Sequence, residues 1–222
     1  MDTPQSVQAQ QEKRDDWPKV AIIVLNWNGW RDTIECLQCV LKLDYPNYGI
    51  VVIDNGSTDD SWERLHMWAR QCENSASVEF HESVAGLDAD CRRGRLAVIR
   101  VEKNLGFSGG CNMGISYALK RDAHYVFLLN NDALVRPDTL RHLITVSHGA
   151  HAPMIGATVM NGEGTKVLFS GIRWPAMLFG LGKMSARPGD VFWSSAYGQG
   201  CALLIRKDLL EMRLAECGHF LD

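Results

Sequence analysis

Apolar and polar positions alternate in blocks along this chain. Short runs of mostly apolar residues, too short for free-standing helices, predict buried strands. These runs cover residues 20–25, 50–53, 96–101 and 125–129. Between them, apolar residues recur at helical spacing and predict helices over 32–43, over 61–70, up to about 119 and from 137 onward. Continuously apolar strands that alternate with helices are typical of a mostly parallel sheet covered on both faces, so we predict an α/β fold.

The rhythm is interrupted twice. Residues 72–95 are polar, with a charge run at 90–95, and predict a loop or insertion. The later elements are predicted strands at 155–160, 166–170 and 198–205, an aromatic and apolar loop at 174–182, and a helix at 207–214. The chain is therefore expected to have a disordered tail over 1–17, a first part over 18–150 and a second part over 151–222.

Polar side chains stand where three of the four long strands end. Asn26 follows the first strand, Asp54 the second, and Asn130 with Asp132 the fourth. One such residue is ordinary turn chemistry, but the carboxyl ends of parallel strands meet at one edge, where α/β sheets bind ligands. We therefore interpret the row as a polar binding edge. A carboxylate oxygen there can hold Mg²⁺ or Mn²⁺ against a diphosphate, which makes Asp132 the candidate metal ligand.

Composition narrows the class of protein. The 222 residues, 46% hydrophobic with a formal net charge of -3, suffice for one sizeable α/β domain and give no indication of a nucleic-acid partner. No apolar run approaches the ~20 residues of a membrane span, and the polar start has no signal-peptide pattern. Seven scattered cysteines suit a reduced, cytoplasmic protein. The one close pair, Cys36 and Cys39, lies in a helical pattern and is interpreted as helix packing.

Four segments together resemble family 2 glycosyltransferases of the GT-A fold, and the rhamnosyltransferase-like branch most closely. They are residues 24–29, 52–59, 104–114 and 128–132, and the resemblance covers about 20–222. It implies sugar transfer, with rhamnose as one candidate, from a dTDP-, UDP- or GDP-sugar to a glycan or lipid-linked acceptor in polysaccharide biosynthesis. In that arrangement residues 18–150 would bind the donor and residues 151–222 would face the acceptor.

The resemblance also implies roles for single residues. The donor nucleotide would contact Asn26, Asp54, Asn104, Gly106, Asn130 and Asn131, the metal Asp132, and the acceptor Gln199 and Gly200. Asp54 would accept a hydrogen bond from a pyrimidine ring N–H. Asn130 occupies the first position of the family's D-x-D-like motif, which leaves one charge fewer for the metal. For Gly109 and Gly110, donor binding and close helix packing remain equal alternatives.

The implied reaction is a single inverting displacement in which a carboxylate base deprotonates the acceptor hydroxyl. The family carries that base in a Glu-Asp pair shortly after a segment resembling residues 220–222. Here Leu221 replaces the usual Asp, so the base is expected beyond Asp222 and the 222-residue chain is expected to transfer sugar very slowly.

Three alternatives stay open from the sequence. The first is a non-catalytic nucleotide-sugar-binding module. The second is a nucleotidyltransferase, although residues 26–30 lack the basic character that its phosphate loop needs. The third concerns the loop at 174–182, which either packs over the sheet edge or makes a peripheral contact with the inner face of the membrane.

Overall fold

The computed structural model describes residues 17–71, 78–82, 96–169 and 201–221. The strands are β1 (Val20–Asn26), β2 (Tyr48–Asn55), β3 (Val78–His81), β4 (Leu96–Val101), β5 (Tyr125–Asn130), β6 (Met154–Gly156), β7 (Val159–Met160), β8 (Val167–Phe169) and β9 (Ala202–Arg206). The helices are α2 (Trp30–Val40), α3 (Ser61–Gln71), α4 (Gly106–Leu119), α5 (Thr139–Gly149) and α6 (Lys207–Cys217).

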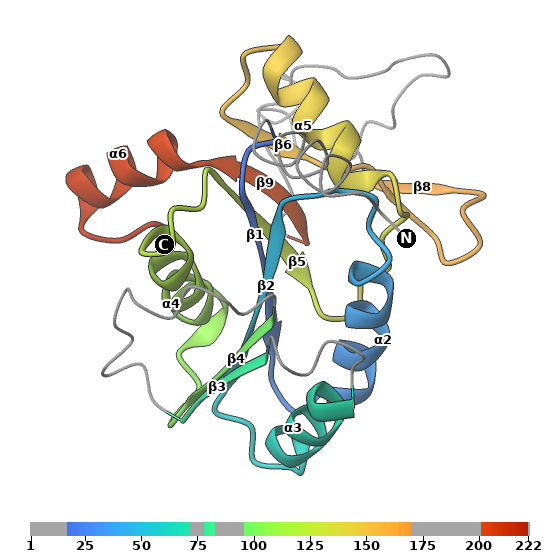
Figure 1. The fold of residues 1–222 in the computed structure, drawn as a ribbon, viewed down its shortest axis with the longest axis vertical. Helices are drawn as coiled ribbons and strands as arrows, with labels where there is room; N and C mark the ends of the chain where they lie inside the picture. Colours follow the sequence, from blue (N-terminus) through green and yellow to red (C-terminus); the bar gives the residue numbers. More distant parts are fainter. Residues whose placement is uncertain (1–16, 72–77, 83–95, 170–200, 222) are drawn as a thin grey trace, which may run out of the picture.

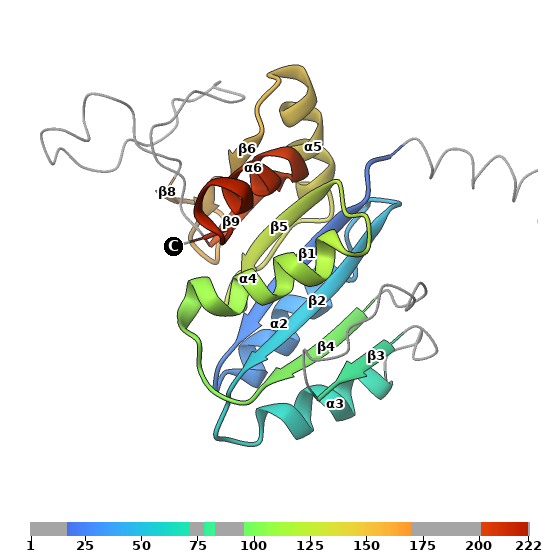
Figure 2. The same ribbon diagram turned by 90° about the vertical axis from the view of Figure 1, so that its left-hand side faces the viewer.

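One seven-stranded sheet forms the centre of the molecule, in the order β3-β4-β2-β1-β5-β9-β6 (Figures 1 and 2). The first five strands of that order are parallel to one another. β9 runs antiparallel to both of its neighbours, β5 and β6. It comes later in the chain than either of them, and in the sheet it lies between them. β7 and β8 form a separate two-stranded ribbon. The predicted α/β fold with a mostly parallel sheet is confirmed.

Each face of the sheet has its own hydrophobic core, because successive strand residues point to opposite sides. In β1, Ile22 and Val24 pack with α2, α3 and α5 on one face, and Ile23 packs with α4 and α6 on the other. Figure 1 shows these helices on the two sides of the sheet. Burial on both faces accounts for the continuously apolar strands, since almost every position of β1 and β2 is buried.

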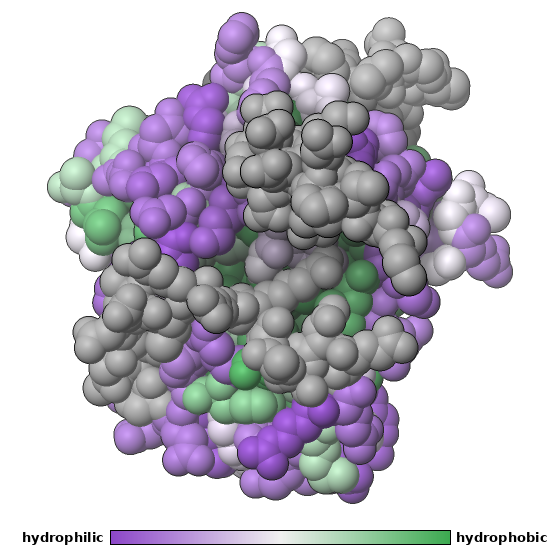
Figure 3. Space-filling model, in the orientation of Figure 1, coloured by the Kyte–Doolittle hydropathy of each residue, from purple (hydrophilic) through white to green (hydrophobic). Residues whose placement is uncertain are grey.

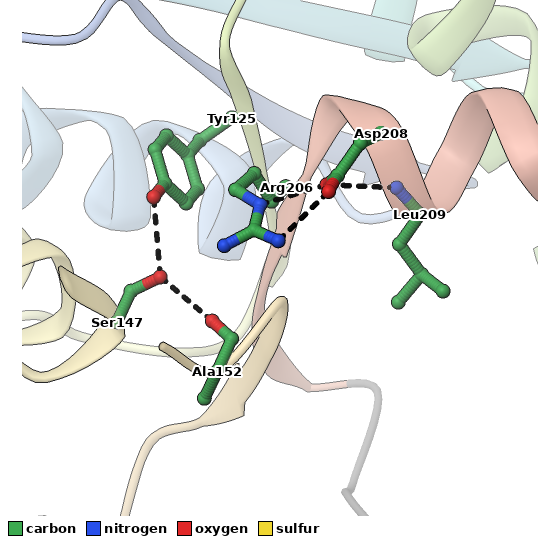
Figure 4. Close-up of polar contacts among 6 residues, drawn as sticks. All are labelled: Tyr125, Ser147, Ala152, Arg206, Asp208 and Leu209. Carbon is green, nitrogen blue, oxygen red and sulfur yellow. Dashed lines mark hydrogen bonds and ion pairs between the residues drawn. The ribbon is translucent and has the colours of Figure 1, made fainter. Parts of the chain in front are cut away.

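Polar contacts close the sheet at the amino end of β5 (Figure 4). The buried Ser147 hydroxyl of α5 donates to the Ala152 carbonyl at 2.8 Å and lies 3.2 Å from the Tyr125 hydroxyl. Arg206, which pairs with Tyr125 in the strand register, donates to Asp208 at the start of α6. These contacts tie α5 and α6 to the strands they follow and leave the carboxyl edge for the polar row.

Three predicted elements differ from the observed ones. The segment 72–95, predicted as loop, contains the short strand β3. The strand predicted over 155–160 is two strands in different sheets, because the backbone leaves the main sheet after Ala157, whose N–H still donates to Ala202. The helix predicted to open at Asp32 begins at Trp30, with Gly29 as its N-cap, so Asp32 lies in the first turn.

Several predictions fall outside the described residues. These are the tail up to residue 16, the charge run at 90–95, the apolar loop at 174–182, the acceptor-side residues Gln199 and Gly200, and Asp222. Among the helices that the structure describes, none is long and apolar enough to cross a membrane. The division at residue 150 stays a prediction, and the central sheet takes strands from both sides of it.

Candidate functional site

The polar strand ends lie side by side at the carboxyl edge of the sheet. Asn26 of β1 is in register with Asp54 of β2, and Asn130 of β5 is in register with Leu25. From β1 the chain proceeds outward to β2 and then to β3 at the edge. It comes back to β4 between those two strands and crosses to the other side of β1 with β5. The edge between β1 and β5 is thus the topological switch point, where open α/β sheets bind their ligands.

A buried cluster joins the ends of β1 and β2. Asn26, fully buried, donates through Nδ2 to Asp54 Oδ1 at 2.9 Å and to Ser57 Oγ at 3.1 Å. Ser57 Oγ donates to the same Asp54 oxygen and accepts from the Asn28 backbone N–H at 2.9 Å. Asp54 Oδ1 therefore accepts two hydrogen bonds, and the cluster holds the carboxylate in a fixed orientation.

The second oxygen of Asp54 differs from the first. Asp54 is fully buried, and among the described residues its Oδ2 has no hydrogen-bond partner. A buried carboxylate oxygen without a donor is costly, and native structures rarely retain one without a functional reason. Asp54 Oδ2 is therefore an unsatisfied acceptor that could accept a hydrogen bond from an N–H or O–H group of a ligand.

Thr33 connects this cluster to β5. Its buried hydroxyl, in the first turn of α2, lies 2.8 Å from Asn26 Oδ1 and 2.9 Å from the Gly29 carbonyl. Asn131 Nδ2 donates to the same hydroxyl at 3.0 Å. A Cβ atom on Gly29 would lie 2.9 Å from Asn131 Nδ2, so the absence of a side chain there lets the β5 loop approach α2.

Asp132 is exposed in the turn that follows β5. Its negative charge acts on two nearby thiols. Burial first, then Cys39 and then Asp132, raises the pKa of Cys36 to about 12. Burial, with a smaller contribution from Asp132, also raises the pKa of Cys201. The Asp132 carboxylate is exposed to solvent, but its charge still affects the two thiols near the end of β5.

These thiols give a testable prediction. Burial raises the pKa of Cys111 to about 12 as well, so at pH 8 only about one in 10⁴ of the Cys36 and Cys111 thiols is ionised. With Ellman's reagent on the native protein, we expect exposed Cys217 to react promptly and these two to stay protected. Unfolding in urea should release them. Native-state labelling of Cys36 as fast as that of Cys217 would contradict the packing interpretation of Cys36.

A second polar loop lies beside β2. The buried Asn55 side chain donates to Asn104 Oδ1 at 3.1 Å and to the Gly106 carbonyl at 3.0 Å, and it accepts from Leu105 N–H. Asn104 Oδ1 also accepts from the Gly106 N–H at 2.7 Å. Asn104 thus organises the turn that opens α4. Gly106 has φ +74°, and a Cβ there would meet no atom within 4 Å.

Two glycines of α4 serve close packing. A Cβ on Gly110 would come within 2.4 Å of Leu25 Cδ1, and one on Gly114 within 2.7 Å of Ile23 Cγ2. α4 therefore lies directly against β1, as glycine permits. For Gly110 these contacts favour the packing alternative. At Gly109, a Cβ would meet only the Leu105 side chain closely, at 2.7 Å.

Asn112 of α4 holds the far end of the chain. Its Nδ2 donates to the Leu221 carbonyl and its Oδ1 accepts the Leu221 N–H, both at 2.9 Å. The adjoining Phe220 is buried in the core under α4. The segment predicted to precede the general base is thus fixed against the helix that opens at the carboxyl edge.

Large apolar side chains are also exposed near this edge. Trp27, 56% exposed, directly follows Asn26, and Phe107, 47% exposed, lies in the first turn of α4. On the face seen in Figure 3, hydrophobic surface is visible near the centre and in smaller areas toward the outline of the molecule. An exposed tryptophan beside a buried polar cluster offers a flat surface to a ring.

The structure therefore brings Asn26, Asp54 and Asn131 into one hydrogen-bonded network, with Asn104 and Gly106 in a neighbouring loop. Sequence reasoning missed Thr33, Asn55, Ser57 and Asn112. Asn55 and Ser57 lie one and three residues after Asp54, where residues of their type are common in turns. Thr33 is one polar residue within a helix, and Asn112 lies in the segment 104–114 that resembles the family, but a single sequence does not show what either side chain contacts.

Comparison with known proteins identifies the family. Residues 21–213 match the model of the family described as "Glycosyl transferase family 2". The glycosyltransferase GlyG of Streptococcus pneumoniae is 26% identical over 56% of this chain and 33% of its own length. The low-salt glycan biosynthesis hexosyltransferase Agl10 of Haloferax volcanii is 29% identical over 53% of this chain and 36% of its own length. The matched region thus spans about a third of these curated relatives.

Solved structures share the fold. The mannosyltransferase PcManGT of Pyrobaculum calidifontis, in complex with GDP-Man and Mn²⁺, superposes with a TM-score of 0.58 at 16% identity, over 94% of this chain and 53% of its own. TarS residues 1–349 from S. aureus, in complex with UDP, gives 0.56 at 16% identity, over 88% and 48%. These likenesses confirm the predicted GT-A type of fold, and the family match covers most of the chain. The protein belongs to glycosyl transferase family 2.

Proposed function

We propose that the protein is an inverting glycosyltransferase that moves a hexosyl group from a nucleoside diphosphate sugar to a hydroxyl of a glycan or lipid-linked acceptor. Residues 18–150 bind the donor, and residues 151–222 face the acceptor. The motif resemblance favours rhamnose as the sugar. Family membership and the polar edge between β1 and β5 support the reaction class.

The observation that carries the proposal is the buried, unpartnered Oδ2 of Asp54. An oxygen of this kind selects a base that presents a ring N–H. Uracil and thymine (N3–H) and guanine (N1–H) do so, whereas cytosine N3 and adenine N1 are acceptors. The exposed Trp27 indole beside the cluster supplies a face on which the base stacks.

A divalent cation fits the other side of the edge. Mg²⁺ in proteins is typically held by one or two carboxylates together with substrate phosphates and water, and Asp132 offers one exposed carboxylate in the turn after β5. When bound there, Mg²⁺ or Mn²⁺ would neutralise charge that grows on the departing diphosphate. Asn130 and Asn131 flank the same diphosphate as neutral amide groups.

The loop that opens α4 suits the sugar or the phosphates. Asn55 and Asn104 fix its backbone, and the open space at Gly106 leaves room for close approach of a ligand. The roles of these residues are binding and orientation. They hold the donor so that its anomeric carbon is open to the acceptor hydroxyl.

Calorimetry with UDP, dTDP, GDP, CDP and ADP, each with and without Mn²⁺, tests the proposal. We expect CDP and ADP to bind about 5- to 150-fold more weakly than the best of the other three, which corresponds to about 1–3 kcal/mol for a buried group left unpaired. Equal binding of all five would remove the role of Asp54. Transfer of a radiolabelled sugar would exclude the alternative of a non-catalytic nucleotide-sugar-binding module.

A further inference from the structure

We propose that Thr33 is a positioning residue that couples the nucleobase side of the donor site to its metal side. The inference rests on the proposed function, because it assigns a role within that donor site. The Thr33 hydroxyl is engaged by Asn26, Gly29 and Asn131, so its role is to hold these residues and not to contact the donor. Its role follows from the direction of the hydrogen bonds around it.

The direction is fixed from the Asp54 end. The Asn26 amide donates through Nδ2 to Asp54 Oδ1 at 2.9 Å, and an amide NH₂ group can only donate, so Nδ2 faces Asp54. Asn26 Oδ1 then faces Thr33 Oγ1 at 2.8 Å. Two oxygens at that distance need a proton between them, and only the threonine hydroxyl supplies one.

The Thr33 proton is thereby committed. A hydroxyl has a single proton, and the carbonyl of Gly29, 2.9 Å away, shares that proton with Asn26 Oδ1. The lone pairs of Thr33 Oγ1 then accept from Asn131 Nδ2 at 3.0 Å. Every bond runs the same way, from Asn131 through Thr33 and Asn26 to Asp54.

This chain of hydrogen bonds joins two functional ends. At one end is the carboxylate proposed to read the base, and at the other is the residue directly before the candidate metal ligand Asp132. Hydrogen bonds in a buried, aligned chain polarise one another, and the chain also fixes the β5 loop relative to β1. A base bound at Asp54 therefore encounters a metal loop already held in place, and a metal-bound diphosphate encounters a fixed Asp54.

The substitution Thr33→Val removes the hydroxyl and keeps the branched shape. The quantity to measure is the metal enhancement, the ratio of the UDP dissociation constant without Mn²⁺ to that with saturating Mn²⁺, by calorimetry. We expect Thr33→Val to reduce this ratio by about fivefold or more, the lower end of the usual range for coupled sites. Thr33→Ser keeps the hydroxyl and should restore most of the ratio.

Ser147→Ala is the matched control. It also deletes a buried hydroxyl with two polar contacts on a helix, but at the opposite edge of the sheet (Figure 4). It should lower the melting temperature and leave the metal enhancement unchanged. A general loss of packing would affect both variants alike, so only a selective loss in Thr33→Val supports coupling.

The other outcomes are distinct. If the wild-type protein binds UDP with a metal enhancement and folded Thr33→Val keeps it in full, the inference is wrong and the proposed function stands. If the wild-type protein binds none of the five nucleotides, the proposed function fails first. Should Thr33→Val not fold, Thr33→Ala removes the same hydroxyl with a smaller side chain and must show the same loss of enhancement.

Discussion

Asp132→Ala is expected to remove the gain in nucleotide affinity that Mn²⁺ provides and to leave the folded protein as stable as before. The carboxylate is exposed in the turn after β5. Surface substitutions of this kind change the free energy of unfolding by about 0.5 kcal/mol or less. The metal, in contrast, would lose Asp132, the carboxylate ligand proposed for it, and without the metal the diphosphate would lose its countercharge.

Calorimetry with UDP and Mn²⁺, together with thermal unfolding, measures both effects. Asp138→Ala is a suitable control, because it deletes another carboxylate in the same connection, one that pairs with Arg136 and His142 at the start of α5. That variant should keep the metal-dependent affinity. If Asp132→Ala unfolds early while its folded fraction binds UDP and Mn²⁺ normally, Asp132 has a structural role and the metal assignment is wrong.

Gly56→Ala is expected to have the largest effect on stability. Gly56 has φ +70°, and a Cβ there would lie 2.5 Å from Asn104 N and from the Lys103 carbonyl carbon. A left-handed conformation costs a non-glycine residue about 1–2 kcal/mol, and an overlap with backbone adds about 1–3 kcal/mol. The sum, about 2–5 kcal/mol, is a large fraction of the ~5–15 kcal/mol typical of a folded domain.

Gly106→Ala separates the two contributions. Its φ is +74°, nearly the same, but a Cβ there meets no atom within 4 Å. Urea unfolding should therefore give a loss of about 1–2 kcal/mol for Gly106→Ala and a distinctly larger one for Gly56→Ala. Equal losses would mean that the loop at Lys103 and Asn104 yields freely, and that β2 and the start of α4 are not held against each other.

The sheet could be predicted because its central strands are apolar without interruption. The run at 20–25 became β1, which the structure extends by the buried Asn26, since a strand buried on both faces is apolar along most of its length. β3 could not be predicted in this way, because two of its four residues, Glu79 and His81, are polar. Its pairing with β4 holds it in the sheet, and pairing of that kind leaves no mark in the local pattern.

The residues of the candidate site that lie at strand ends could be predicted from the sequence. Asn26 and Asp54 were expected together because both close parallel strands, and the register confirms it. The link through Thr33 was not, because it depends on where α2 begins. A helix that begins at Trp30 places Thr33 in its first turn, facing Asn26. The sequence favoured Asp32 as the opening residue, and that start would have changed the position of Thr33 in the helix.

The place of β9 between β5 and β6 has a consequence for synthesis on the ribosome. β5 and β6 are made first, but β6 reaches the sheet only through β9, whose last residue follows Gly156 by roughly 50 residues. At ~5–20 residues per second, that interval is ~3–10 s. Throughout it, the outer edge of β5 exposes unpaired backbone groups that can template another strand. The nascent chain thus passes through a period of seconds in which chaperones, or a neighbouring nascent chain, compete with β9 for the same edge.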